Sequence, residues 1–340
     1  MAKARLDLTR AQILAFRRRV GALDERLPRG RRSLRRAAWA GLQDSVPRSA
    51  LLSIHARVED AHPSSWEDPS LVQVWGPRFS TYVVPARDRA LFTLGRLPDD
   101  GPGRQRAEEI AARLHAFLDG RVLTDGEAGR ALGVNSNAFR YAAPTGTVLI
   151  RWEGARAPTI WTVPRPDVEP LAARRELARR YLHVFGPTTP SSFATWAGIG
   201  LVEADAAFDG LVRSLTPVRT PIGEAWILER DEPELRAAGG PAAAARLLPS
   251  GDTYYLLQGA DRELLVPDAR RRSELWTSRV WPGTVLVGGE IAGTWRRAQA
   301  KVTAQPWRRL TRAERDAVEE EAAGLPLPGV EGQISVRWDG

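Results

Sequence analysis

The spacing of apolar residues predicts several groups of short helices, and each group is followed by extended chain. The helices expected in the N-terminal part span residues 8–20, residues 31–42, a segment beginning at Pro47, and residues 69–75. Thr9 and Ser45 are expected to cap two of these helices. The alternating residues 79–85 are expected to form a strand. Short helices followed by strands are typical of a winged-helix unit.

The same order of elements returns twice further along the chain. In the second group, helices are expected at residues 104–118, 123–132 and 135–142, and strands at 147–152 and 158–163. In the third group, helices are expected at residues 171–185, 189–196 and 203–215, and a small wing at 218–219 and 224–228. Three helical groups that each end in a hairpin predict tandem winged helices.

The C-terminal quarter of the chain is richer in alternating, strand-like sequence. Strands are expected at residues 254–257, 263–266, 284–287, 290–296 and 332–338, with a helix at 311–323. Gly288 and Gly289 stand where a two-residue hairpin turn needs glycine. The predicted fold class is therefore mainly α with β (α+β), with three tandem winged-helix units and a small C-terminal antiparallel sheet region. The predicted boundaries are 1–100, 101–168, 169–245 and 246–340.

Composition narrows the class of protein. The chain has 340 residues, of which 43% are hydrophobic and 26% charged, and no apolar run is long enough to span a membrane. The N-terminus lacks the apolar core of a signal peptide, so we expect a cytoplasmic, nucleoid-associated protein without a membrane or protein partner. The chain has no cysteine, and its four histidines show no ligand-like spacing. We therefore expect no metal and no cofactor.

Positive charge is concentrated near the N-terminus. Residues 1–57 carry 14 basic and 4 acidic residues, a net charge of +10, whereas the whole chain carries +8. This clustering favours a polyanion as partner, with nucleic acid ahead of an anionic membrane surface. A GC-rich genome would explain why arginine replaces lysine, but it would not explain the clustering.

A polar triplet, Gln43, Asp44 and Ser45, lies between two helical patterns inside this basic segment. A helix N-terminus with free backbone N–H groups, a Gln amide and several arginines would suit a phosphate group. The alternative is an ordinary capped corner between two helices, and Asp44 at a helix entrance is often simply a cap.

Five sequence blocks resemble, in order, those of the bacterial tandem winged-helix DNA glycosylases, which excise bulky alkylated bases or unhook crosslinks. The blocks read GLQDSVPRSALLSIHARV, WEDPSLVQVWGPRFSTYVVP, FGPTTPSSFATWAGI, LLPSGDTYYLL and VGGEIAGTWRR. The resemblance runs from about residue 8 to residue 338. It implies tandem winged helices, binding to double-stranded DNA that carries bulky alkyl adducts, and catalysis by the triplet.

The triplet departs from the pattern of the family. Active members typically show Gln, an apolar residue, and then Gln or Asp, whereas this chain has Gln43, Asp44 and Ser45. Either the carboxylate has moved by one residue, or this member binds lesions without cutting them well. We expect Asp44 to stabilise positive charge or activate water, and Gln43 and Ser45 to hold the water or the adjacent phosphate.

These considerations predict a function and its residues. The predicted activity is monofunctional DNA glycosylase hydrolysis of bulky N7- or N3-alkylated purines, with self-resistance to a DNA-alkylating natural product as a role; the alternative is a non-catalytic DNA-binding or lesion-sequestering protein. No lyase step is expected, because the only amines, Lys3, Lys301 and the N-terminus, lie outside the five blocks. The residues expected to contact DNA are Arg31, Arg32, Arg35, Arg36, Arg48, Gly288, Gly289, Arg296 and Arg297. The alternative for the Gly288–Gly289 hairpin is a structural turn with solvated arginines.

Overall fold

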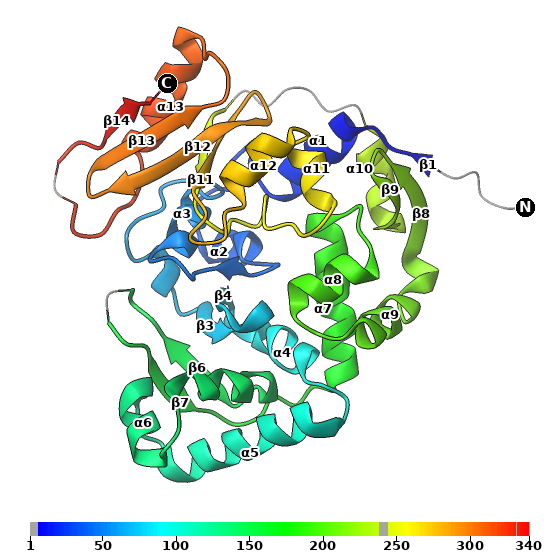
Figure 1. Ribbon diagram of the computed structural model, residues 1–340, viewed down its shortest axis with the longest axis vertical. Coiled ribbons are helices and arrows are strands. Elements are labelled where there is room, and N and C mark those ends of the chain that lie inside the picture. Colours follow the sequence, from blue (N-terminus) through cyan, green and yellow to red (C-terminus); the bar gives the residue numbers. More distant parts are fainter. Residues whose placement is uncertain (1–5, 155, 238–243, 331, 340) are drawn as a thin grey trace, which may run out of the picture.

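The computed structural model describes residues 6–154, 156–237, 244–330 and 332–339 (Figure 1). The chain has a mixed α+β fold in which helices surround four small sheets, as the sequence predicts. Among the described residues, no helix combines the length and apolarity that crossing a membrane requires.

The first group of elements builds a three-stranded antiparallel sheet with the strand order β2-β4-β3. Its elements are α2 (Arg31–Ala37), β2 (Leu42–Gln43), α3 (Ser49–His55), β3 (Leu71–Trp75) and β4 (Thr81–Pro85). The predicted helix at residues 69–75 is wrong, because this segment forms β3. A short apolar run such as LVQVW suits either structure, and pairing with β4 decides for the strand.

The second group repeats this order. It contains α5 (Gly101–Leu118), β5 (Leu123–Thr124), α6 (Asp125–Leu132), a 3-10 helix (Ser136–Thr145), β6 (Val148–Arg151) and β7 (Thr159–Thr162), with the strand order β5-β7-β6. Thr124 caps α6 through a reciprocal capping box with Glu127. The core of this group includes Trp75 from β3, so the first two groups pack on each other.

The third group is completed by the N-terminus of the chain. It contains α7 (Pro170–Phe185), α8 (Pro190–Ala197), α9 (Leu201–Asp209), β8 (Leu215–Thr220), β9 (Gly223–Leu228) and α10 (Glu232–Arg236). β1 (Leu6–Asp7) pairs in parallel with β8, and α1 (Arg10–Val20), capped by Thr9 as predicted, packs on the same core. Residues 6–20 therefore lie against the third group, although they precede the first in sequence.

The C-terminal part forms a five-stranded sheet in the order β10 to β14. Its elements are β10 (Arg246–Leu248), α11 (Asp261–Leu265), α12 (Ala269–Leu275), β11 (Gly283–Val287), β12 (Glu290–Ala298), β13 (Lys301–Pro306), α13 (Arg312–Ala323) and β14 (Ser335–Trp338). β14 pairs in parallel with β13, so the expectation of a purely antiparallel sheet is wrong. The expected strands at 254–257 and 263–266 are also wrong: the first is loop, and most of the second belongs to α11.

Buried arginines join the groups. Arg17 of α1 donates to the carbonyl oxygens of Phe185 and Gly186, and Arg96 donates to those of Ala197 and Trp75. Carbonyl oxygens at helix ends and turns lack partners in their own element, and a guanidinium group supplies several donors at once. Part of the N-terminal arginine surplus thus holds the fold together rather than facing a partner.

Candidate active site

The triplet lies at one end of the first sheet. Gln43 ends β2 and pairs with Tyr82 of β4, and the main-chain N–H of Asp44 donates to the Thr81 carbonyl oxygen at 2.7 Å. Ser45 follows and is exposed. Because side chains alternate along extended chain, Gln43 and Asp44 point to opposite faces of the sheet.

The Asp44 carboxylate points into the protein and is 1% exposed. Its Oδ1 accepts the N–H of Ala50 at 3.0 Å, and its Oδ2 accepts the side-chain amide of Gln73 at 2.8 Å. Burial raises the pKa of Asp44 to about 7, and the two hydrogen bonds act in the opposite direction. The carboxylate is thus enclosed by protein and hydrogen-bonded at both oxygens.

The helix after the triplet begins later than predicted and is capped differently. It starts at Ser49 rather than Pro47, and Arg48 before it adopts a left-handed conformation with φ 69°. Asp44, not Ser45, accepts a free N–H of the first turn, that of Ala50. A buried carboxylate at this end also complements the helix dipole.

Gln73 of β3 is a site residue that the sequence reasoning missed. Besides its bond to Asp44, its Oε1 accepts the N–H of Trp152 at 2.7 Å and its Nε2 donates to the Trp152 carbonyl oxygen at 3.2 Å. Both ends of the amide are therefore fixed, and the hairpin of the second group is tied to the residue below the triplet. The only signal in the sequence is that Gln73 interrupts the apolar run LVQVW.

The side-chain amide of Gln43 is only partly hydrogen-bonded. Its Nε2 donates to Ser45 Oγ at 3.1 Å, whereas its Oε1 is buried and has no hydrogen-bond donor among the described residues. The amide packs against Gly251: a Cβ at that glycine would lie 3.1 Å from Gln43 Cδ. A buried acceptor without a donor is costly, so this atom is a candidate for contact with a ligand.

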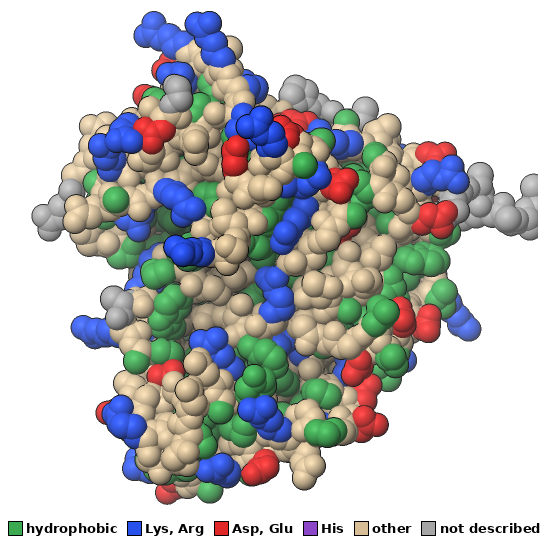
Figure 2. Space-filling view, viewed as in Figure 1, with side chains coloured by type: hydrophobic (Ala, Val, Ile, Leu, Met, Phe, Trp, Pro, Cys, Tyr) green, Lys and Arg blue, Asp and Glu red, His purple; other side chains and the backbone are tan. Residues whose placement is uncertain are grey.

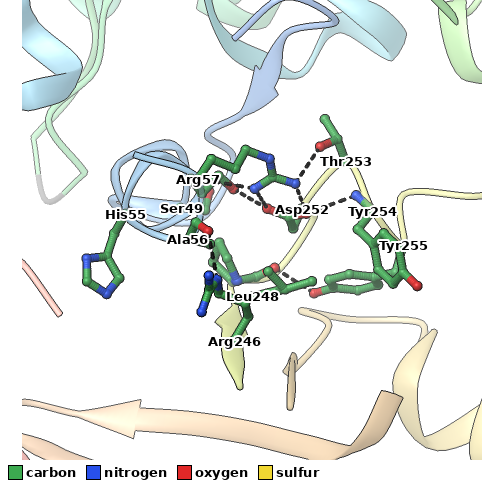
Figure 3. A network of polar contacts seen from close by, with 12 residues as sticks. Ser49, His55, Ala56, Arg57, Arg246, Leu248, Asp252, Thr253, Tyr254 and Tyr255 are labelled. Atoms are coloured by element: carbon green, nitrogen blue, oxygen red, sulfur yellow. Dashed lines mark hydrogen bonds and ion pairs between the residues drawn. The ribbon is translucent and has the colours of Figure 1, made fainter. Parts of the chain in front are cut away.

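The loop that carries Gly251 is held by a buried ion pair to Arg57, two residues after the end of α3 (Figure 3). Both terminal nitrogens of the Arg57 guanidinium group donate to the Asp252 carboxylate, at 2.6 and 2.7 Å, and Ser53 Oγ donates to the same carboxylate at 2.7 Å. Tyr255 secures the other side of the loop, because its hydroxyl donates to the Pro249 carbonyl oxygen. Arg57 and Asp252 belong to two of the five sequence blocks, GLQDSVPRSALLSIHARV and LLPSGDTYYLL, but only the fold brings them together.

A cavity of about 250 Å³ opens between the start of α3 and the C-terminal sheet. Its lining combines apolar, aromatic and basic side chains: Val46, Pro47, Ser49, Leu52, Pro249, Ser250, Val280, Trp281, Pro282, Gly283, Trp295, Arg296 and Arg297. Arg296 and Arg297 are exposed at the edge of this cavity. The structure thus brings these two predicted arginines close to the triplet.

The predicted arginines of the first group have separate surroundings. Arg31 pairs with Asp68 at 3.4 Å, Arg36 lies over the ring of Trp39, and Arg32 and Arg35 form no ion pair within the described residues. Burial is the main cause that lowers the pKa of Arg36.

Arg48 is held against the hairpin of the second group. Its guanidinium group lies 4.7 Å from the centre of the Trp66 ring and donates to the Glu153 carbonyl oxygen.

The Gly288–Gly289 turn forms as predicted, with φ 62° and 84°. Gly289 is buried, and its carbonyl oxygen accepts a hydrogen bond from Arg18 at 3.1 Å. Arg10 and Glu290 form an ion pair beside the turn. This end of the hairpin is therefore packed on α1, and it is the opposite end of β12 that reaches the cavity.

Charge is unevenly distributed over the face shown in Figure 2. Lys and Arg side chains run down the hollowed middle of this face, whereas acidic side chains gather mainly at its right-hand and upper edges. Such a surface attracts a polyanion and steers it towards the hollow. Within the described residues, no group of three or more His, Asp or Glu side chains could hold a metal ion.

The comparison with protein families decides the assignment. The family described as "DNA glycosylase AlkZ-like" matches residues 34–326, which include the triplet, the Asp252 loop and the cavity. The chain belongs to the AlkZ-like DNA glycosylase family. It is thus a DNA-repair glycosylase by family, and the family's enzymes are hydrolases that act on DNA.

A solved structure supports the AlkZ-like fold. The Streptomyces sahachiroi DNA glycosylase AlkZ is similar to this chain with a TM-score of 0.79 over 98% of this chain and 100% of that one. The two sequences are 19% identical, so this likeness is one of fold. No curated protein sequence matches the chain.

Proposed function

We propose that this AlkZ-like glycosylase hydrolyses the N-glycosidic bond of bulky N7- or N3-alkylated purines in double-stranded DNA. The observation that carries the proposal is the buried, unpaired Oε1 of Gln43, which lies in the triplet that the family resemblance marks as catalytic. The cavity beside α3 offers room for a bulky substituent. An enzyme with this substrate would serve self-resistance to a DNA-alkylating natural product.

The chemistry is within reach of an amide and a hydroxyl group. Alkylation at N7 or N3 gives the purine a positive charge, so it leaves without strong acid assistance. What the enzyme must add is stabilisation of the positive sugar and a placed water. Gln43 Oε1 accepts a hydrogen bond from that water or faces the sugar, and Ser45, exposed beside it, holds the water or the neighbouring phosphate.

Asp44 acts as a positioning residue in this proposal. Its carboxylate joins the start of α3 to Gln73 and so fixes the main chain between Gln43 and Ser45. The charge is close to the triplet but separated from solvent. Its contribution to catalysis therefore passes through the two residues that flank it.

We also propose that the enzyme is monofunctional. A lyase step needs an amine that attacks the sugar. Lys301 opens β13 at the turn after β12 and does not line the cavity, and Lys3 lies outside the described residues. Water is thus the nucleophile.

The three helical groups are proposed to be winged-helix units, within the boundaries 1–100, 101–168, 169–245 and 246–340. The support is the repeated order of helix, short strand, two helices and hairpin, with sheet orders β2-β4-β3 and β5-β7-β6. In the third group an isolated bridge between Thr188 and Trp226 stands in the place of the short strand. Residues 6–20 are the exception to these boundaries, because β1 and α1 pack in the core of the third group.

A second candidate function is lesion binding without excision. It is favoured by the departure of the triplet from the family pattern, because Ser45 brings no carboxylate and the Asp44 carboxylate is buried. A protein of this kind would bind the adduct in the same place and leave the bond intact.

The two candidates differ in the product they give. Duplex DNA with a bulky N7-alkylguanine, incubated with excess enzyme, should release the free modified base and leave alkali-labile abasic sites. No covalent complex should form on borohydride reduction. Binding without release of base would establish the second candidate, and a trapped complex would contradict the monofunctional proposal.

A further inference from the structure

A second cavity, of about 440 Å³, lies where the turn between β3 and β4 meets the second helical group. It shares no lining residue with the cavity beside α3. The turn, α5 and the 3-10 helix of the second group line it with aromatic, basic and amide side chains: Phe79, Arg106, Asn135, Asn137, Ala138, Arg140 and Tyr141. None of these lining residues is an Asp or a Glu.

Two aromatic rings meet in the wall of this cavity. The ring of Phe79 packs edge-on against that of Tyr141, with 5.1 Å between the two centres. The guanidinium group of Arg106 lies 4.1 Å from the centre of the Tyr141 ring. Tyr141 is nevertheless 40% exposed, and in the described part of the chain it is the one aromatic residue among the exposed large apolar side chains. Part of a well-held ring is thus open to a flat ligand.

The position of Phe79 is enforced by its surroundings. Phe79 and the preceding Arg78 have left-handed backbone angles, with φ 57° and 53°, which large side chains rarely adopt. The backbone of Arg78 lies against Gly198 after α8, where a Cβ would stand 3.1 Å from both N and Cα of Arg78. The buried guanidinium group of Arg96 lies 4.9 Å from the centre of the Phe79 ring. Strain that the structure maintains in this way is often found at functional sites.

The basic groups of the cavity have no carboxylate partners. Neither Arg106 nor Arg140 forms an ion pair within the described residues. Asn135 Oδ1 accepts the N–H of Asn137 at 2.9 Å, so the NH2 group of the Asn135 amide is left as a donor. Guanidinium groups and amide donors together suit an anion such as a phosphate. Beside an exposed aromatic ring, the ligand that combines a phosphate with a flat ring is a nucleotide.

The cavity lies within reach of a DNA strand that passes the triplet. Thr81, whose carbonyl oxygen accepts the Asp44 N–H, is two residues from Phe79, a span of about 7 Å in extended chain. A strand of duplex DNA rises by about 3.4 Å per nucleotide. The wall formed by Phe79 is thus only a few nucleotides from the triplet.

We propose that this cavity holds one unpaired nucleotide of the DNA, with its base against the ring of Tyr141 and its phosphate on Arg106 and Arg140. Every base has a π face, so stacking on an aromatic ring requires no particular sequence. A nucleotide leaves the helix at least cost where damage has weakened its pairing, as beside a bulky adduct. The inference rests on the proposed function in that the DNA passes the triplet, but it does not depend on which bond is cut.

The test compares two undamaged DNAs, a fully paired duplex and the same duplex with one unpaired thymidine in its middle. The parent should bind the second DNA more tightly. Tyr141→Ala should reduce this preference by roughly 5-fold or more, because it removes the stacking surface, and should leave the affinity for the paired duplex nearly unchanged. Replacing both Arg106 and Arg140 by Gln removes one phosphate contact. For the DNA with the unpaired thymidine, this double variant should flatten the slope of log affinity against log salt by about 0.9.

Three control variants separate stacking from other effects. Tyr141→Phe keeps the ring and should keep the preference for the unpaired thymidine. Tyr141→Leu fills similar space without an aromatic ring and should lose this preference as Tyr141→Ala does. Arg121→Gln is the matched arginine control: Arg121 lies 5.2 Å from the centre of the Phe117 ring in the same helical group but does not line the cavity. It should leave the preference and the salt slope unchanged.

The outcomes distinguish this inference from the proposed function. A parent that binds both DNAs equally, or an unchanged preference in Tyr141→Ala and Tyr141→Leu, would overturn the nucleotide site, while release of a modified base by the parent would still stand. A preference that depends on Tyr141 in a parent that releases no base would support the nucleotide site and contradict the glycosylase proposal.

Discussion

The side-chain amide of Gln73 donates to Asp44 Oδ2 at 2.8 Å and, with its other contacts, is fixed on the main chain of Trp152. One amide thus joins the triplet of the first helical group to the hairpin of the second. Since the amide cannot rotate without losing two bonds to Trp152, it presents a donor to Asp44 at all times. The position of the triplet therefore depends on packing between two groups that are remote in sequence.

The coupling between these two residues is measurable by a double-mutant cycle. Gln73→Ala should lower the free energy of unfolding by about 1–3 kcal/mol, because it leaves a buried carboxylate with one donor fewer. In an Asp44→Ala background, Gln73→Ala should lower the free energy of unfolding by less. The difference between the two losses, which is the coupling free energy of the pair, should be about 1 kcal/mol or more. Gln305→Ala on β13 is the exposed control and should change stability by less than about 0.5 kcal/mol. Additive effects of Gln73→Ala and Asp44→Ala would show that the hydrogen bond contributes nothing.

Stability should depend on pH through Asp44. Its pKa is raised from 3.8 to about 7 in the folded protein, so the folded state holds the proton more tightly than the unfolded chain. The stability that this proton provides is fully present below about pH 4 and is lost as the pH rises through about 7, up to about 4 kcal/mol in all. Asp44→Asn abolishes this dependence. Urea unfolding measures the difference in free energy of unfolding between the variant and the parent, and this difference should shift in favour of the variant between about pH 5 and pH 8. A difference that stays constant over this range would contradict the raised pKa.

The buried Arg57–Asp252 pair should matter far more than an exposed one. Arg57→Met leaves the Asp252 carboxylate buried, and we expect a loss of about 3–5 kcal/mol in the free energy of unfolding. The exposed pair Arg312–Asp316 on α13 is the control, for which Arg312→Met should cost less than about 1 kcal/mol. Equal losses in the two variants would mean that the loop at Asp252 does not need this ion pair.

The contact between Gly251 and Gln43 can be tested with two matched glycines. Gly251→Ala places a Cβ 3.1 Å from Gln43 Cδ, whereas Gly259 has open space around it and also has a positive φ. Both variants bear the strain of a left-handed alanine, but only Gly251→Ala displaces the Gln43 amide. We expect single-turnover base release to fall by roughly 10-fold or more in Gly251→Ala alone. Equal rates in the two variants would show that the position of this amide does not limit the reaction.

Local patterns predicted most of the helices and three of the hairpins, because capping residues and amphipathic spacing act over a few residues. Thr9 caps the helix expected of it, and Gly288 and Gly289 form the expected turn. The site was less accessible to such reasoning. Gln73 and Asp252 acquire their roles only when β3 pairs with β4 and the loop docks on α3, and neither event leaves a local signature.

The sequence led us to expect Asp44 to stabilise positive charge or activate water, because the direction of its side chain also leaves no local signature. A carboxylate between two polar residues suggests a solvent-facing group. Its direction is set by the alternation along β2 and by the free N–H of Ala50, which turn it inward. The family resemblance located the triplet, and the pleat of the sheet turns the Asp44 side chain away from that of Gln43.

The central claim is that Gln43, and not Asp44, faces the reacting sugar, and single-turnover release of an N7-alkylguanine from duplex DNA tests it most directly. Gln43→Ala should lower the rate by roughly 10²-fold or more with nearly unchanged DNA affinity. Asp44→Asn, compared at a pH where it folds as stably as the parent, should retain most of the activity because the main-chain geometry persists. Full activity in Gln43→Ala, or a loss in Asp44→Asn as large as that expected for Gln43→Ala, would contradict the account.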